Sequence, residues 1–112
     1  MSIISSNNAG LKSVKIKLED FKKFGWKLSE ISFALAAPGM PWEKWAFHEE
    51  FQIKIRIVYD HKGYVEHATV MESKYVPLNQ LHLDLAKMYN TYDLYRFMEY
   101  MNFLKENSYL FP

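Results

Sequence analysis

Four histidines are the residues of this chain whose chemistry best suits binding a metal ion or moving a proton. They occur as His48-Glu49-Glu50, His61, His67 and His82-x-Asp84. A zinc pair on a helix needs histidines at positions i and i+4, and no two histidines here have that spacing. His61 is expected in a solvated turn, and His67 on the apolar side of a strand. The sequence therefore predicts no metal site.

Other groups that carry out catalysis also lack a catalytic arrangement. Glu49 and Glu50 are expected on a strand, where adjacent side chains point to opposite faces and cannot share a proton. The four glycines form no phosphate-binding loop, and the serines form no nucleophile elbow. The chain has no cysteine, which excludes a thiolate nucleophile and a disulfide framework. We expect no enzymatic activity and no cofactor, although a site assembled only in space would leave no such motif.

Length and composition are those of a folded domain. The chain has 112 residues, of which 49% are hydrophobic and 24% charged, so we expect one globular domain over 1–112. The Ser- and Asn-containing start, 1–11, is expected to be flexible. We expect neither a membrane span nor a secretory signal, and a cytoplasmic location, since a cysteine-free chain suits a reducing compartment.

Basic residues are concentrated near the start of the chain. Residues 1–27 hold six lysines and only two acidic residues, whereas the whole chain has a formal charge of +1. Such a patch could contact phosphates. However, arginine is the commoner choice for bidentate phosphate recognition, and the lysines are interpreted mainly as solubilising residues. The candidate nucleic-acid residues are Lys12, Lys15, Lys17, Lys22, Lys23 and Lys27.

Aromatic residues are the most unusual feature, at 17% of the chain. An aromatic-rich core would account for many of them, but a small domain has a limited interior, and tyrosine, phenylalanine and methionine are also typical of protein-binding surfaces. Pro41 is expected to open a short helical turn, on which two tryptophans share a face. Three more rings fall off or at the margin of the apolar stripe of the last predicted helix. The candidate partner-binding residues are Tyr95, Tyr100, Phe103, Trp42 and Trp45.

A β-hairpin over 47–72 is the clearest predicted element. Alternating apolar residues predict one long strand from Phe47 to Asp60, and the turn 60–63 ends in a glycine suited to a left-handed conformation. If Asp60 pairs with Tyr64, the opposed pairs are Ile57 with His67, Ile55 with Thr69 and Ile53 with Met71. Arg56 is then a diagonal neighbour of Glu66. A further strand, 13–18, is predicted from alternating lysines and apolar residues.

Helices are predicted from apolar residues spaced by three and four positions. One is expected at about 20–36; the alternative is a short helix that ends at Gly25, with Ser29 capping a second one. Others are expected at 77–89, opened by Pro77, and at 92–106, with Thr91 as its N-cap. The predicted fold is α+β: a small antiparallel sheet of the central hairpin and strand 13–18, with the three helices packed on one face.

This order of elements differs from that of double-stranded-RNA-binding domains and of ferredoxin-like RNA-binding domains, and the aromatic motifs of the latter are missing. In its general character, short, aromatic and without a catalytic motif, the chain resembles small inhibitors such as toxin immunity proteins and phage-encoded anti-defence proteins. This likeness assigns no residues.

Three functions are consistent with these observations. The first is an intracellular module that binds another protein, or a second copy of the chain, through an aromatic surface and so inhibits or regulates it. The second is a nucleic-acid-associated module that uses the lysines. The third is a small enzyme or ligand-binding domain with a pocket between sheet and helices.

Overall fold

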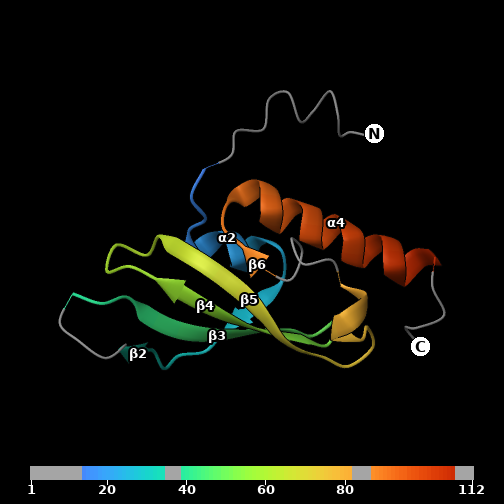
Figure 1. Ribbon diagram of the computed structural model, residues 1–112, viewed down its shortest axis with the longest axis horizontal. Coiled ribbons are helices and arrows are strands. Elements are labelled where there is room, and N and C mark those ends of the chain that lie inside the picture. Colours follow the sequence, from blue (N-terminus) through green and yellow to red (C-terminus); the bar gives the residue numbers. More distant parts are fainter. Residues whose placement is uncertain (1–13, 35–38, 82–86, 108–112) are drawn as a thin grey trace.

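A computed structural model describes residues 14–34, 39–81 and 87–107, which form an antiparallel sheet with two helices on one side (Figure 1). The strands lie in the order β1-β3-β4-β5-β6, and β2 also pairs with β3. This arrangement confirms the α+β class. The elements are α2 (Leu18–Lys23), β1 (Trp26–Leu28), β2 (Phe33–Ala34), β3 (Trp42–His48), β4 (Ile53–Tyr59), β5 (Val65–Ser73), the 3-10 turn η1 (Leu78–Gln80), β6 (Lys87–Met88) and α4 (Thr91–Asn107).

The hairpin of β4 and β5 forms the centre of the sheet, as predicted. Its turn closes through Asp60, whose backbone N–H donates to the Tyr64 carbonyl at 2.9 Å, and Gly63 has a φ of +87°. The three isoleucines of β4, at positions 53, 55 and 57, are fully buried. They pack in one core with Phe21 of α2 and with Leu94, Phe97, Met98 and Met101 of α4.

The expected pairing register of the hairpin is wrong because β5 contains two bulges. Glu66 and Met71 are unpaired, so Ile57 lies opposite Ala68, Ile55 opposite Val70 and Ile53 opposite Ser73. A bulge inserts one residue and moves every later side chain to the other face. His67 therefore lies opposite Val58, away from the isoleucines.

The long strand expected from Phe47 to Asp60 is two strands. β3 ends at His48, and a turn through Gln52 reverses the chain into β4, with the Gln52 N–H donating to the His48 carbonyl at 2.8 Å. Gln52 has a φ of +54°, in the left-handed region that the turn requires. The residues of this turn carry no glycine or proline to signal it, and the alternation weakens only at Glu49.

The helix expected at 20–36 is also wrong. α2 ends at Lys23, and Gly25, with a φ of +92°, redirects the chain into the short strands β1 and β2. The alternative of a short helix ending at Gly25 is confirmed in its first half only, since Ser29 is followed by β2. Phe24 and Ile31, which the helical stripe placed in the core, are exposed.

Two more predicted elements take other forms. The expected helix 77–89 is the turn η1, with Pro77 at its N-cap, and then β6, which pairs Met88 with Ala68; residues 82–86 lie outside the described residues. The expected strand 13–18 reduces to one bridge, Lys17 to Tyr64, before α2 begins at Leu18. Residues 1–13, including the start expected to be flexible, also lie outside the described part.

The helix predicted at 92–106 is confirmed as α4, and its predicted stripe is the buried one. The cap differs by one residue from the expected Thr91. The Asp93 N–H donates to Asn90 Oδ1 at 2.9 Å, and Asp93 Oδ2 accepts from the Tyr89 N–H at 2.9 Å, so Asn90 caps the helix.

Replacing Ile55 by alanine should lower the free energy of unfolding by about 2–5 kcal/mol, because the removed atoms leave a cavity at the centre of the core. Urea denaturation of the Ile55→Ala variant measures this loss. Val14→Ala, at a residue that is 52% exposed, is the control and should change stability by less than about 0.5 kcal/mol. Equal losses in the two variants would contradict the assignment of Ile55 to the core.

Candidate functional site

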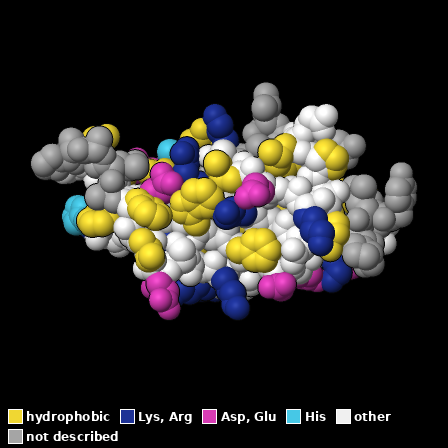
Figure 2. Space-filling view, turned by 90° about the horizontal axis from the view of Figure 1, so that it is seen from below, with side chains coloured by type: hydrophobic (Ala, Val, Ile, Leu, Met, Phe, Trp, Pro, Cys, Tyr) yellow, Lys and Arg dark blue, Asp and Glu magenta, His cyan; other side chains and the backbone are white. Residues whose placement is uncertain are grey.

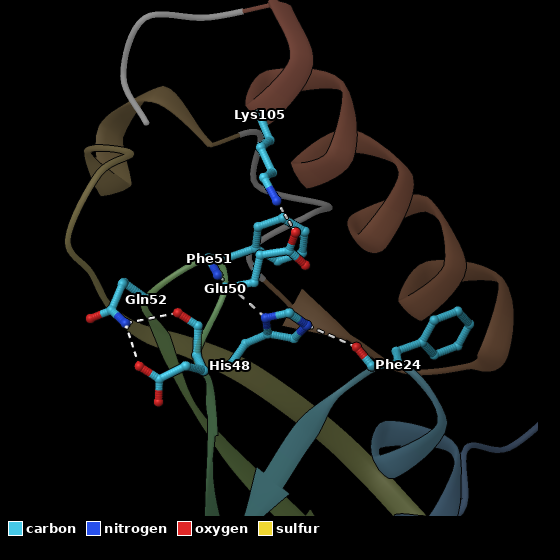
Figure 3. Close-up of polar contacts among 7 residues, drawn as sticks. Phe24, His48, Glu50, Phe51, Gln52 and Lys105 are labelled. Carbon is cyan, nitrogen blue, oxygen red and sulfur yellow. Dashed lines mark hydrogen bonds and ion pairs between the residues drawn. The ribbon is translucent and has the colours of Figure 1, made fainter. Parts of the chain in front are cut away.

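His48 is the buried polar residue at the end of β3, and both of its ring nitrogens are engaged (Figure 3). Nε2 lies 2.8 Å from the Phe24 carbonyl oxygen, and Nδ1 lies 3.3 Å from the Phe51 backbone nitrogen. A carbonyl only accepts and an N–H only donates, so Nε2 carries the proton and Nδ1 accepts. The imidazole is therefore neutral and fixed in one tautomer, with neither nitrogen free for a metal or a substrate.

The ring of His48 also joins an aromatic cluster. It stacks on Phe51 at a centroid distance of 4.4 Å and meets Trp26 edge-on at 5.1 Å. The Trp26 indole N–H in turn donates to the sulfur of Met98 on α4 at 3.3 Å. This cluster connects the start of β1, the end of β3 and the last helix. Burial, only partly opposed by the hydrogen bond to Phe24 and by the charge of Glu50, lowers the pKa of His48 below its ordinary 6.5.

The other side of the sheet is uncovered in the described part of the chain. Because side chains alternate along a strand, the residues between the buried ones point away from the helices. We call this surface the open face. Its members are Phe33 of β2, Glu43, Trp45 and Phe47 of β3, Lys54 and Arg56 of β4, and His67, Thr69 and Glu72 of β5; Val58 of β4 lies on the same side but is buried among its neighbours.

Hydrophobic side chains gather over the middle of the open face, with acidic and basic groups among them (Figure 2). An open hollow on it is lined mainly by Ser29, Ile31, Phe33, Glu43, Trp45 and Lys54. Ile31 is 66% exposed, Phe33 is 52% exposed and Trp45 is half-buried. A contiguous exposed apolar area of this kind is typical of a binding site.

Charged side chains on the open face are paired with one another. Lys54 Nζ lies 3.4 Å from Glu72 and 4.5 Å from the centre of the Trp45 ring. Arg56 pairs with Glu43 at 3.9 Å, instead of with the expected Glu66, and its buried Nε has no hydrogen-bond partner. The charges of the open face thus largely cancel one another, and they lie among its apolar side chains.

The five predicted partner-binding rings do not form one patch. Trp42 and Trp45 lie on strand β3 instead of a helical turn, three positions apart, so they point to opposite faces. Tyr95, Tyr100 and Phe103 lie on α4, on the far side of the sheet. Tyr100 packs against the core and Tyr95 is half-buried, whereas Phe103 is 58% exposed. Only Trp45 belongs to the open face.

Sequence reasoning missed Ile31 and Phe33 because both fall within the helix expected at 20–36. The spacing of Ile31 places it on the buried stripe of that predicted helix. Phe33 belongs to a strand of only two residues, which is too short to show an alternating pattern of its own. Its place on the open face is set by pairing with β3.

The predicted lysines are divided among several places. Lys17 and Lys22 line one hollow beside α2, and Lys22 and Lys27 line a second. Lys23 pairs with Asp20 of the same helix at 3.6 Å. Lys15 is exposed before α2, and Lys12 lies outside the described residues.

Comparison with protein-family models, curated proteins and solved structures finds no match. Within residues 14–34, 39–81 and 87–107, no three His, Asp or Glu side chains are grouped as metal ligands. No helix in the same ranges is long and apolar enough to cross a bilayer. Function must therefore be inferred from the surfaces themselves.

Stability should fall as the pH drops below the ordinary histidine pKa of 6.5. His48 has the lower pKa in the folded state, so the unfolded chain binds the extra proton first, and folding weakens until the pH passes the folded pKa. The free energy of unfolding, measured at about pH 7.5 and about pH 5.5, should show this loss. The His48→Gln variant should have a smaller pH dependence of stability than the wild type. An unchanged pH dependence in His48→Gln would refute the assignment.

Gly25 should tolerate alanine less well than Gly63, although both have a positive φ. A Cβ at Gly25 would lie 3.0 Å from His48 Nε2, whereas a Cβ at Gly63 has no neighbour within 4 Å. Both variants should lose about 1 kcal/mol from backbone strain. Gly25→Ala should lose about 1–3 kcal/mol more from overpacking, measured by thermal or urea unfolding. Equal losses of stability in the two variants would show that His48 moves away from the added methyl group at no energetic cost.

Proposed function

We propose that this chain is a small cytoplasmic module that binds another protein through the open face and thereby inhibits or regulates it. The observation that carries the proposal is the exposed apolar hollow around Trp45, on the side of the sheet that no described helix covers. The partner would insert an apolar side chain between Ile31, Phe33 and Trp45.

The side chains around the hollow favour a protein partner over a nucleic acid. Lys54 and Arg56 are each paired with a carboxylate, so the open face offers no excess positive charge to a phosphate backbone. Exposed aromatic side chains are enriched at protein interfaces. A partner carbonyl or carboxylate beside the hollow could compete for Arg56, whose contact with Glu43 is long in the free chain.

The rings of α4 are the second place at which a partner could bind. Phe103 is exposed there, but Tyr100 contributes to the core and Tyr95 is half-buried, so their substitution would also disturb packing. The open face offers several accessible apolar side chains around one hollow, and it is therefore the surface we propose. Phe103 then becomes a useful control.

Alanine at Phe33 or Trp45 should weaken partner binding by about 30-fold or more, as expected for a desolvated aromatic anchor worth about 2 kcal/mol. Partners are first trapped in cells of the native host by a photo-crosslinking amino acid at position 33 and at position 103. The protein captured at position 33 is then purified and titrated by calorimetry with Phe33→Ala, Trp45→Ala and Phe103→Ala. Unfolding curves of the variants verify that each is folded.

Full-strength binding by Phe33→Ala and Trp45→Ala, with loss in Phe103→Ala, would move the interface to α4 and overturn the proposal. Position 33 could instead crosslink to a second copy of the chain, with dimers in sedimentation that Trp45→Ala dissociates. This result would show that the open face mediates self-association instead of binding a different protein.

A further inference from the structure

A second surface, beside helix α2, has a different chemistry from the open face. A hollow there is lined by four lysines, Lys17, Lys22, Lys44 and Lys62, together with Leu18 and Leu28. An adjoining hollow shares Lys22, Leu28 and Lys44 with the first and extends to Lys27 at the edge strand β1. We call this continuous surface the lysine groove.

The lysine groove brings together residues that are distant in the sequence. Lys17, Lys22 and Lys27 belong to the basic start of the chain, whereas Lys44 comes from β3 and Lys62 from the turn of the central hairpin. The hairpin turn reaches the groove because the Leu18 N–H donates to the Gly63 carbonyl at 3.2 Å. Folding thus produces a denser cluster of positive charge than the sequence order indicates.

Lys44 has the most unusual position of these lysines, because it lies on the core side of the sheet. It lies on the same side of β3 as the buried Ala46 and His48, opposite the buried Ile57, and is itself half-buried. A position facing the core side of a sheet ordinarily holds an apolar side chain. None of the acidic side chains in the described ranges forms an ion pair with Lys44, and the same holds for Lys22, Lys27 and Lys62.

Acidic residues at the lysine groove are few. Glu19 lines the first hollow and Glu30 the second, against five lysines in all. Like charges held close together repel, and a bound anion would remove that repulsion. The groove therefore has the excess positive charge that the open face lacks.

We propose that the lysine groove binds the sugar–phosphate backbone of a nucleic acid without regard to sequence. Lysine is depleted at protein–protein interfaces, whereas it binds phosphate readily as a compact point charge. The aromatic ring that lines the groove, Trp26, is buried, and Tyr64 next to the hairpin turn has Lys17 Nζ 5.5 Å from its centre. The groove therefore offers phosphate contacts instead of a platform for stacked bases. Such binding is weak and strongly dependent on salt.

Fluorescence anisotropy with labelled single-stranded RNA and DNA of about 16 nucleotides, and with a duplex of that length, tests the proposal on the full chain. At about 50 mM salt the wild type should bind, and its affinity should fall steeply as salt rises. The variant Lys22→Gln/Lys44→Gln should bind at least tenfold more weakly, with a salt slope shallower by roughly 1.4 for single strands, about 0.7 for each lost phosphate contact. Lys74→Gln/Lys87→Gln removes the same charge outside the groove and should bind as the wild type does.

Three results would overturn the proposal. The first is that no probe binds at low salt. The second is an equal loss of affinity for the probe in the two double variants. The third is displacement of the probe by poly-glutamate of equal charge at equal concentration. The last result would identify the groove as a site for an acidic polypeptide. Trp45→Ala should leave nucleic-acid binding unchanged, so the outcome at the groove is independent of the outcome at the open face.

Discussion

Burial of the β4 isoleucines under the two helices is the interaction on which the rest of this structure depends. Ile53, Ile55 and Ile57 have no exposed surface, and α2 and α4 supply the apolar side chains that cover them. Because side chains alternate along a strand, this burial forces Lys54 and Arg56 to the opposite side. Both helices lie on one side of the sheet, so the same constraint that builds the core creates the open face.

The aromatic cluster around His48 fixes the parts of the fold that the isoleucines do not reach. Its imidazole ties the end of α2, through the Phe24 carbonyl, to the turn after β3, through the Phe51 N–H. An ion pair between Lys105 and Glu50 connects the same turn to the end of α4. Histidine is often a catalytic residue, but His48 is buried here and connects the end of α2 to the turn after β3. The two candidate binding surfaces, the open face and the lysine groove, lie elsewhere.

Local periodicity is sufficient to predict the elements that form the core. Alternation over β4, interrupted only at the buried Val58, and a stripe of spacing three and four over α4 agree with burial in the structure. The spacing of Phe21, Phe24 and Leu28 is misleading, because Gly25 interrupts the helix and tertiary pairing with β3 turns residues 26–28 and 33–34 into strands. The bulges of β5 leave no trace in the alternation, which is why the register could not be predicted.

Candidate sites are predictable only where they are local in sequence. Trp45 and the lysines near the start of the chain could be identified, but their neighbours Phe33, Lys44 and Lys62 join them only through β-pairing and the hairpin turn. The resulting separation, a neutral apolar surface on one side and a basic groove at the edge beside α2, is a property of the folded sheet.

Hydroxyl-radical footprinting with mass spectrometry tests the central claim, that the open face is the binding surface, most directly. In the free chain, Ile31, Phe33 and Trp45 should be oxidised readily, and the buried Trp26 should be protected. In the complex with the protein crosslinked from position 33, protection should appear at those three residues, while Phe103 on α4 should remain as reactive as before. Protection at Phe103 with no change at Phe33 and Trp45 would contradict the account.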